Sequence, residues 1–312
     1  MSDADNEPAM TATPNRRCGF VAVLGATNVG KSTLVNALVG VKVSIVSHKV
    51  QTTRVPVRGI ALEGDSQMVF IDTPGIFNPK RRLDRAMVDA AWGGAEDADV
   101  VVLVLDAARG VDEDAAKIID KLKSSRMKRV VVLNKIDRVE DKPRLLALTK
   151  HVDGLIRFDR LFMISASNGK GVPALKSYLA ETMPLGPWHY AEDDVTDAPL
   201  RVLAAEITRE RIYHWLHEEL PYSTTVETTS WKTLKDGSAR IEQTIFVERD
   251  GQKAIVLGKN GATIKQISME ARRAIADIAD HPVHLFLFVK VRENWGSDPE
   301  RYREMGLPFP KS

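Results

Sequence analysis

The feature that most constrains this chain is a glycine-rich segment that follows directly on a short apolar run. Residues 20–24 are all apolar, and residues 25–32 read G-x-x-x-x-G-K-S. A strand, a loop of this kind and then a helix bring several main-chain N–H groups close to one anion, because glycine has no Cβ to block the approach. We therefore expect a loop that wraps the phosphates of a nucleoside triphosphate, contacting it through Gly25, Ala26, Thr27, Asn28, Val29, Gly30, Lys31 and Ser32.

Two side chains of this loop supply charge and a metal ligand. Lys31 places a positive charge at the β and γ phosphates, and the hydroxyl of Ser32 is a ligand for Mg²⁺. The helix expected to begin at Ser32 adds the positive end of its dipole to the same site. The loop thus predicts a nucleotide site with Mg²⁺ as cofactor.

A second motif, Asp72-Thr73-Pro74-Gly75, ends the apolar run at residues 68–71. The carboxylate of Asp72 can hold Mg²⁺ through water, and the N–H of Gly75 can meet a γ-phosphate. We expect the nucleotide to contact Asp72, Thr73, Pro74, Gly75 and the next residue, Ile76.

A third motif indicates which base is bound. Asn134, Lys135 and Asp137 follow the apolar run at residues 130–133. The Asp137 carboxylate can accept hydrogen bonds from N1–H and from the exocyclic amine of guanine, whereas adenine offers neither donor. A wrong base would leave the carboxylate unpaired, so the motif predicts a strong preference for guanine.

A fourth, weaker motif follows the apolar run at residues 161–164. It comprises Ser165, Ala166 and Ser167, from which we expect a main-chain N–H to reach the guanine O6. Alone this tripeptide carries little information. Its order and spacing after the other three motifs give it weight.

Taken in this order, the four motifs resemble the nucleotide-binding domain of translation-factor-like G proteins. The segment Gln51-Thr52-Thr53-Arg54 resembles the first switch of the bacterial Era, EngA and MnmE group, in which a threonine closes over Mg²⁺. Spacing leaves open whether Thr52 or Thr53 is that ligand. The resemblance implies an α/β domain with a mixed, mostly parallel sheet and helices on both faces.

The same resemblance implies slow GTP hydrolysis, with Lys31, Thr52, Thr53, Asp72 and Gly75 as the catalytic group. Ile76 stands where a Ras-type enzyme has the glutamine that orients water, and it has no group for that task. In this group of G proteins an asparagine at the position of Asn28 accompanies a bound K⁺ ion that replaces an arginine finger. The alternative is that Asn28 has no role in binding K⁺ and occupies this position only because asparagine favours turns.

The chain of 312 residues is too long for this domain alone. Proline-rich and acidic sequence after the fourth motif indicates a linker, and about 110 residues follow it. Helical periodicity runs from 200 to 220, strand-like sequence covers 223–229 and 240–248, a short apolar stretch covers 254–257, a long amphipathic helix spans 264–278, and a last strand spans 283–291.

Gly258-Lys259-Asn260-Gly261 joins the last two helical segments, and this arrangement resembles a prokaryotic-type (type II) KH domain of α+β fold. A G-x-x-G link alone is weak, because glycine turns between helices are common. Between 252 and 292, however, seven Lys or Arg face three acids, a net charge of +4 that favours phosphates. The resemblance implies single-stranded RNA binding by Gly258, Lys259, Asn260, Gly261, Lys265, Arg272 and Arg273.

A G domain with this switch and a C-terminal KH domain resembles the Era family of GTPases over nearly the whole chain. We expect a disordered tail at 1–16, the G domain at 17–184, the linker at 185–199, the KH domain at 200–295 and a C-terminal tail at 296–312. The family implies a GTP/GDP switch that binds 16S rRNA near its 3′ end and assists assembly and maturation of the 30S subunit. The alternatives are an RNA scaffold or chaperone with incidental hydrolysis, and a membrane-associated regulatory GTPase.

Composition narrows the setting of this activity. A single cysteine, Cys18, allows no intramolecular disulfide, and no apolar run approaches the roughly 20 residues that span a bilayer. We therefore expect a monomer in the cytoplasm, with a peripheral contact at the inner face of the cell membrane as a further expectation. The net charge of +2 by itself predicts nothing about nucleic acid.

Overall fold

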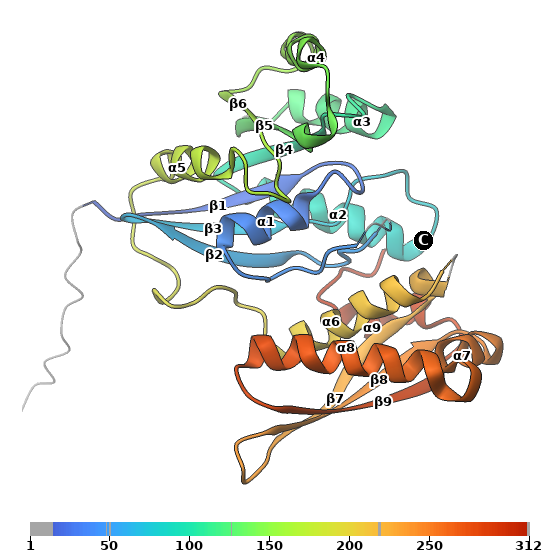
Figure 1. Ribbon diagram of the computed structural model, residues 1–312. Helices are drawn as coiled ribbons and strands as arrows, with labels where there is room; N and C mark the ends of the chain where they lie inside the picture. The colour runs from blue at the N-terminus through green and yellow to red at the C-terminus, as the bar shows by residue number, and fades with distance from the viewer. Residues whose placement is uncertain (1–14, 48, 50, 126, 218–219, 311–312) are drawn as a thin grey trace, which may run out of the picture.

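The computed structural model describes residues 15–47, 49, 51–125, 127–217 and 220–310. The chain forms two units that pack against each other (Figure 1). Of the tail expected at 1–16, only residues 15 and 16 are among those described, so that expectation lies outside the description. The first unit contains the G-protein motifs and is called the G domain; the second contains the G-x-x-G link and is called the KH domain.

The G domain is built on a six-stranded sheet in the order β2-β3-β1-β4-β5-β6, in which only the β2–β3 pair is antiparallel. Its strands are β1 (Arg17–Leu24), β2 (Val57–Glu63), β3 (Ser66–Asp72), β4 (Val100–Asp106), β5 (Lys128–Asn134) and β6 (Arg160–Met163). Its helices, on both faces of the sheet, are α1 (Lys31–Val39), α2 (Arg82–Glu96), α3 (Glu113–Lys123), α4 (Lys142–Leu155) and α5 (Val172–Thr182). The fold class expected from sequence is confirmed for this unit.

The apolar runs form the central strands because both faces of the sheet are covered. All seven residues of β3 and all seven of β4 are buried, as a parallel sheet between two helical layers requires. β1, β3 and β5 run parallel, so the segments that follow them meet at one edge of the sheet. This edge collects the first three motifs, and the fourth follows β6 at the same edge.

The KH domain has the element order α6-β7-β8-α7-α8-β9, the order expected for a type II KH domain. Its elements are α6 (Leu200–Trp215), β7 (Thr225–Thr233), β8 (Ala239–Val247), α7 (Asp250–Leu257), α8 (Ala262–Ala279) and β9 (Val283–Val291). The sheet order is β7-β8-β9, with β8 antiparallel to β7 and parallel to β9. The helix expected over 200–220 ends earlier, at Trp215, because Leu216 is extended and its main-chain oxygen accepts a hydrogen bond from Lys49 Nζ of the G domain.

Residues 296–310, the described part of the segment that sequence assigns to a C-terminal tail, are folded together with the end of the KH domain. A 3₁₀ turn at Trp295–Ser297 and helix α9 (Pro299–Glu304) follow, and Trp295, Tyr302 and Leu307 are buried in one cluster with Leu83 and Met87 of α2. The indole of Trp295 donates to the main-chain oxygen of Ser223 at 3.0 Å. This segment is too short to show periodicity, and its core is completed by the G domain, which is why sequence patterns did not reveal it.

The segment between the domains is held along the edge strand β2. Main-chain N–H of Ile60 donates to Val195 O at 2.9 Å, and Arg58 forms an ion pair with Asp197 at 2.8 Å. The acidic residues 192–194 within it are exposed, as expected of a solvated connection. The connection therefore lies against the G domain before it enters α6.

Candidate nucleotide site and RNA-binding surface

The glycine-rich loop lies between β1 and α1, as its sequence predicts. Gly30 has φ 99°, and a Cβ at this position would lie 2.4 Å from Asn134 Nδ2, so only glycine fits. No side chain caps the first turn of α1. The N–H groups of that turn are therefore the part of the helix suited to receive an anion.

Lys31 is buried at the centre of this loop. Its Nζ donates to the main-chain oxygens of Gly25 at 3.1 Å and Ala26 at 2.9 Å. Burial lowers the pKa of Lys31 to about 8, and the nearby Asp72 only partly opposes that shift. A phosphate group at the site would supply the missing counter-charge and raise the pKa again.

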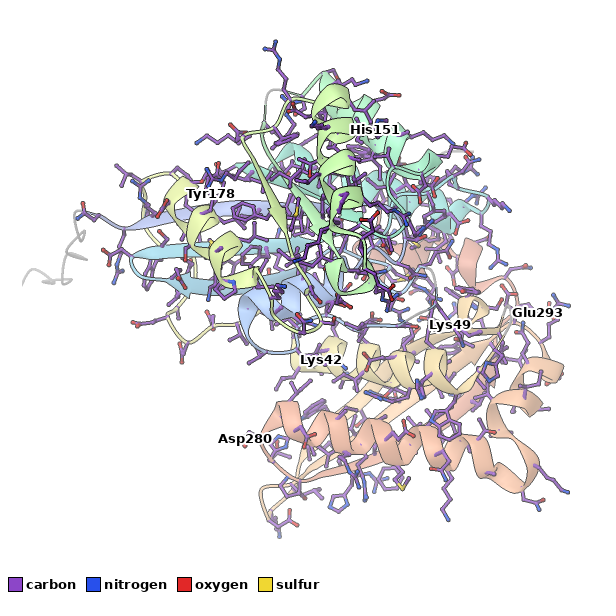
Figure 2. The ribbon with its side chains drawn as sticks, turned by 45° about the horizontal axis from the view of Figure 1, so that its top comes forward. Lys42, Lys49, His151, Tyr178, Asp280 and Glu293 are labelled. Atoms are coloured by element: carbon purple, nitrogen blue, oxygen red, sulfur yellow. The ribbon has the colours of Figure 1, made fainter. Side chains whose placement is uncertain are left out.

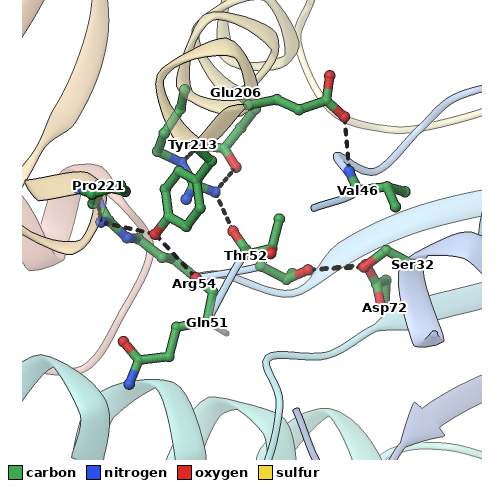
Figure 3. A network of polar contacts seen from close by, with 12 residues as sticks. Ser32, Val46, Gln51, Thr52, Arg54, Asp72, Glu206, Tyr213 and Pro221 are labelled. Atoms are coloured by element: carbon green, nitrogen blue, oxygen red, sulfur yellow. Dashed lines mark hydrogen bonds and ion pairs between the residues drawn. The ribbon is translucent and has the colours of Figure 1, made fainter. Parts of the chain in front are cut away.

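Three oxygen-bearing side chains meet beside the loop. The hydroxyls of Ser32 and Thr53 are 3.0 Å apart, and Thr53 Oγ1 donates to Asp72 Oδ2 at 3.3 Å (Figure 3). The other carboxylate oxygen, Oδ1, is buried without a hydrogen-bond partner among the described residues. Burial raises the pKa of Asp72, while the Ser32 hydroxyl and the charge of Lys31 lower it. A hard cation would compensate the unpaired oxygen, so this donor set fits Mg²⁺.

The two adjacent threonines of the switch segment differ sharply. Thr53 is 8% exposed and faces Ser32, whereas Thr52 Oγ1 donates to its own loop at Lys49 O, 2.9 Å away. Spacing in the sequence does not distinguish Thr52 from Thr53. In the structure, the hydroxyl of Thr53 is the one that lies beside Ser32 and Asp72.

Asn134 connects three of the motifs. Its Nδ2 donates to Val29 O at 2.9 Å, and its Oδ1 accepts from the N–H of Ala166 at 3.0 Å. Asn134 is buried, and its two hydrogen bonds hold the glycine-rich loop and the fourth motif at the end of β5. The Ala166 N–H, which could reach guanine O6, is thus engaged with Asn134, and the identity of the O6 donor stays a prediction.

A cavity of about 400 Å³ lies over these motifs and has the size of a small-molecule site. Asp137 is exposed at its wall. Thirteen of the expected contact residues line the cavity, namely Thr27, Asn28, Gly30, Lys31, Ser32, Thr52, Thr53, Gly75, Asn134, Lys135, Asp137, Ala166 and Ser167. The remaining expected contacts are Gly25, Ala26, Val29, Asp72, Thr73, Pro74, Ile76 and Ser165, all buried beneath it.

Asp106 is a site residue that motif reading missed. Its carboxylate accepts from Lys135 Nζ at 2.8 Å, and the same Nζ donates to the main-chain oxygen of Asn28 at 2.5 Å. Lys135 is thereby held across the glycine-rich loop. The sequence position of Asp106 could have indicated this role, because Asp106 ends the apolar strand β4 as Asp72 ends β3.

The switch segment also contacts the KH domain through a buried arginine. Arg54 reaches out of the G domain, donating from Nη1 to Thr224 O at 2.8 Å and from Nη2 to the Tyr213 hydroxyl at 3.4 Å (Figure 3). Tyr213 in turn donates to Gln51 O at 3.3 Å. The guanidinium lies over the ring of Trp295, with its carbon 5.4 Å from the centroid.

Helix α6 makes the reciprocal contacts to the G domain. Arg209 Nη2 donates to the main-chain oxygen of Thr52 at 2.5 Å, and Arg209 is held by an ion pair with Glu206. The next residue, Glu210, accepts a hydrogen bond from the N–H of Val46 at 2.8 Å and forms an ion pair with Lys42. Figure 2 labels Lys42 beside α6. The described residues between Lys42 and Arg54 are therefore bound at several points to the KH domain.

The G-x-x-G link lies between α7 and α8. Gly258 has φ 73°, and a Cβ there would lie 2.2 Å from Thr263 Oγ1 and 2.8 Å from Thr263 N, whereas a Cβ on Gly261 would meet nothing closer than 4.0 Å. Gly258 is thus required by packing, and Gly261 leaves open space beside the chain. The link itself carries the exposed Lys259 and Asn260, the exposed Ile255 precedes it on α7, and three more exposed cations follow it along α8, namely Lys265 near its start and Arg272 and Arg273 about two turns further on.

Comparisons with known proteins follow the same division. A family model described as "50S ribosome-binding GTPase" matches residues 20–135, and one described as "KH domain" matches residues 219–296. The GTPase Era of Brucella melitensis is 61% identical over 99% of this chain and 98% of its own length. The GTPase Era of Afipia carboxidovorans is 62% identical over 98% and 99%. The chain belongs to the Era family of GTPases.

Solved Era structures match both domains at once. One, of Era in complex with MgGDPNP and nucleotides 1506–1542 of 16S ribosomal RNA, has a TM-score of 0.89 and 36% identity over 93% of this chain and 99% of its own. A single-residue variant of Aquifex aeolicus Era bound to GDP.AlF4⁻ gives the same values. Within the residues described here, no helix is long and apolar enough to cross a membrane.

Proposed function

We propose that this Era-family protein is a GTP-hydrolysing switch that binds 16S rRNA near its 3′ end and assists assembly and maturation of the 30S subunit. The observation that carries the proposal is the bonding of the switch segment to α6. The main-chain oxygen of Thr52 accepts from Arg209 of α6, and Arg54 donates to Thr224 O, so the segment proposed to respond to the γ-phosphate contacts the domain proposed to bind RNA. Occupancy of one site can thereby bias the other.

In the nucleotide-bound state, Ser32 and Thr53 would hold Mg²⁺ through their hydroxyls, with Asp72 behind them. The cation supplies charge neutralisation for the phosphate oxygens. Lys31 turns from the main-chain oxygens of the loop to the β and γ phosphates and regains a counter-charge there. Gly75 lines the cavity wall, where its N–H can meet the γ-phosphate. These groups stabilise the negative charge on the γ-phosphoryl oxygens in the transition state. Such stabilisation is the main way in which proteins catalyse phosphoryl transfer.

Ile76 is buried and apolar, so it does not orient the attacking water. We therefore assign part of the transition-state charge stabilisation to K⁺ held at the exposed loop residue Asn28. Asn28 adopts φ 62° in the wall of the cavity. A slow intrinsic rate follows from the lack of a glutamine at position 76.

The RNA part of the proposal rests on the KH domain. The glycine link leaves the backbone accessible at Gly261, while Lys259 in the link and Lys265, Arg272 and Arg273 along α8 are exposed cations. The family-model description names the 50S subunit, whereas the Era structure that covers nearly the whole chain was solved with 16S rRNA. We favour 16S rRNA, because the 50S description applies to a match within the G domain alone.

The setting of this activity is proposed as well. We place the protein in the cytoplasm as a monomer bound to the small ribosomal subunit. A peripheral contact with the inner face of the cell membrane is the remaining part of the proposal, for which the exposed cations of the KH domain are the available surface.

The test of this function compares RNA binding by matched lysine variants. Lys259→Ala removes a cation from the glycine link, and Lys235→Ala removes an equally exposed cation from the hairpin between β7 and β8. With a fluorescent RNA that ends in the 3′ sequence of 16S rRNA, anisotropy should show weaker binding for Lys259→Ala, by about tenfold, and no change for Lys235→Ala. GTP affinity should be the same for both.

A backbone variant completes the test. Gly261→Asp places a negative side chain in the open space of the link, where RNA would pass, and should abolish measurable binding; because Gly261 has φ 76°, the substitution also costs about 1 kcal/mol of backbone strain. Gly258→Asp is unsuitable, because its Cβ would overlap Thr263 and disturb the fold. Undiminished RNA binding by folded Gly261→Asp and Lys259→Ala variants would remove the KH surface, and with it the proposed rRNA function.

A further inference from the structure

A second cavity lies on the other side of the switch segment, between the two domains. Its volume is about 500 Å³, within the range of small-molecule sites, and it shares no lining residue with the nucleotide cavity. Its walls come from the switch segment, from α6, from β7 and from the C-terminal segment after β9. Neither the nucleotide nor an RNA strand on the glycine link would occupy it.

The wall of this cavity carries an excess of positive charge. Four arginines line it against two glutamates, namely Arg54, Arg201, Arg209 and Arg301 against Glu206 and Glu227. The glutamates are used by Arg209 and Arg301. Arg201 donates to Thr228 O at 3.0 Å, and Arg54 donates to main-chain oxygens and a tyrosine hydroxyl. Within the residues described, no ion pair neutralises Arg54 or Arg201.

One buried donor in this wall has no acceptor. Arg209 is 1% exposed, and its Nη1 has no hydrogen-bond partner among the described residues. A buried guanidinium nitrogen without an acceptor is costly, so such groups normally have a partner. An anionic group inside the cavity would supply that acceptor and would also balance the excess charge.

The rest of the wall is apolar and aromatic. Val202, Ala205, Val226 and Met305 line it, together with the indole of Trp295. Val202 is 48% exposed, which puts it at the mouth of the cavity, whereas Trp295 is 2% exposed and forms part of the interior. A ligand that satisfies both parts of the wall has an anionic head and an apolar or aromatic body.

We propose that this interdomain cavity is a second ligand site, which binds a small organic anion about the size of a nucleoside monophosphate. The head would be a phosphate, sulfonate or carboxylate bound by Arg201 and Arg209, and the body would pack on Val202, Val226 and Trp295. Because the walls belong to both domains, the occupant stabilises this domain arrangement. The inference concerns a separate site and stands whether or not the rRNA proposal holds.

The probe for this site is 8-anilinonaphthalene-1-sulfonate, an aromatic sulfonate. Full-length protein saturated with GDP and with the 3′-end RNA keeps both other sites filled. In methyl NMR spectra, the probe should shift the signals of Val202, Val226 and Met305 and saturate at one equivalent. Shifts confined to other methyl groups, or no saturation, would overturn the proposal.

The anionic head is tested with a matched neutral probe. N-phenyl-1-naphthylamine has the same aromatic body without the sulfonate. The parent protein should bind this neutral probe at least about tenfold more weakly than the sulfonate. The Arg201→Gln variant should bind the two probes with similar affinity. Arg201 is exposed, so this substitution preserves the fold, and Arg211→Gln on the same helix is its control. Equal binding of the two probes by the parent protein would show a merely apolar surface and reject an anion site.

A blocking variant tests the location. Val202→Trp fills the mouth of the cavity from an exposed position and should weaken sulfonate binding by about tenfold or more, with RNA binding and GTP affinity unchanged. If Val202→Trp binds the sulfonate as the parent does, with the same methyl shifts, the ligand lies elsewhere and the proposal fails.

Discussion

Arg209 of the KH domain donates a hydrogen bond from Nη2 to the main-chain oxygen of Thr52, at 2.5 Å. The next residue, Thr53, carries the hydroxyl that lies 3.0 Å from Ser32 beside the glycine-rich loop. A single peptide thus separates a contact to the KH domain from a contact to the hydroxyl group that we propose as a metal ligand. Movement of the switch segment cannot alter one without straining the other.

The two threonines of the switch should respond differently to truncation. Thr53→Ala removes the hydroxyl beside Ser32 and Asp72 and should lower the rate of GTP hydrolysis by about 100-fold, whereas Thr52→Ala should change it by less than about threefold. Single-turnover hydrolysis over a range of Mg²⁺ concentrations measures both. Thr53→Ser should restore most of the rate. Equal losses for Thr52→Ala and Thr53→Ala would contradict the assignment.

Base choice should follow the carboxylate at the cavity wall. Asp137→Asn exchanges an acceptor for an amide that can also donate, so preference should move from GTP towards XTP by at least about 100-fold. Competition binding with the two nucleotides gives the ratio directly. A variant that keeps the affinity of the parent for GTP and ignores XTP would show that another group reads the base.

Hydrolysis should be several-fold faster in K⁺ than in Na⁺ at equal ionic strength. The reason is the proposed cation at Asn28, which supplies positive charge for the transition state. Asn28→Ala should remove the difference between the two salts while leaving GTP binding intact. Equal rates in both salts for the parent protein would exclude the K⁺ part of the mechanism and leave the loop assignment untouched.

The buried Lys31 should destabilise the nucleotide-free protein below pH 8. Its pKa is lowered from 10.5 to about 8, so between these values the unfolded state binds more protons and stability rises with pH. Relative to Lys31→Met, which lacks this group, the parent should gain about 3 kcal/mol of unfolding free energy as pH rises through this window. Urea unfolding at several pH values measures the difference. If the unfolding free energies of both proteins changed with pH in the same way, burial would not lower the pKa of Lys31.

The nucleotide site could be predicted from sequence because its parts are local. The glycine-rich loop follows directly on β1, and Asp72 and Asn134 end β3 and β5, and parallel strands bring such positions to one edge of the sheet. The choice between Thr52 and Thr53 could not be made, because neighbouring residues of an irregular segment have no periodicity to fix where they face.

The contacts between domains were not visible in the sequence. Arg209 occupies a helical position that reads as one more charged residue on α6, and its partner is a main-chain oxygen 157 residues away. Tyr302 falls in the segment that sequence assigns to a tail, because its buried surroundings belong partly to α2. Tertiary burial of this kind leaves no local pattern.

The most direct test of the account is the effect of nucleotide on RNA affinity when Arg209 is replaced. In the parent protein, the 3′-end RNA should bind at least about fivefold more tightly with GDPNP than with GDP. Arg209→Gln should bring this ratio close to one, Tyr213→Phe should reduce it partly, and Lys235→Gln, at an exposed cation of the hairpin between β7 and β8, should leave it unchanged. If folded Arg209→Gln keeps the ratio of the parent, the hydrogen bond from Arg209 to Thr52 does not carry the coupling and the central claim is wrong.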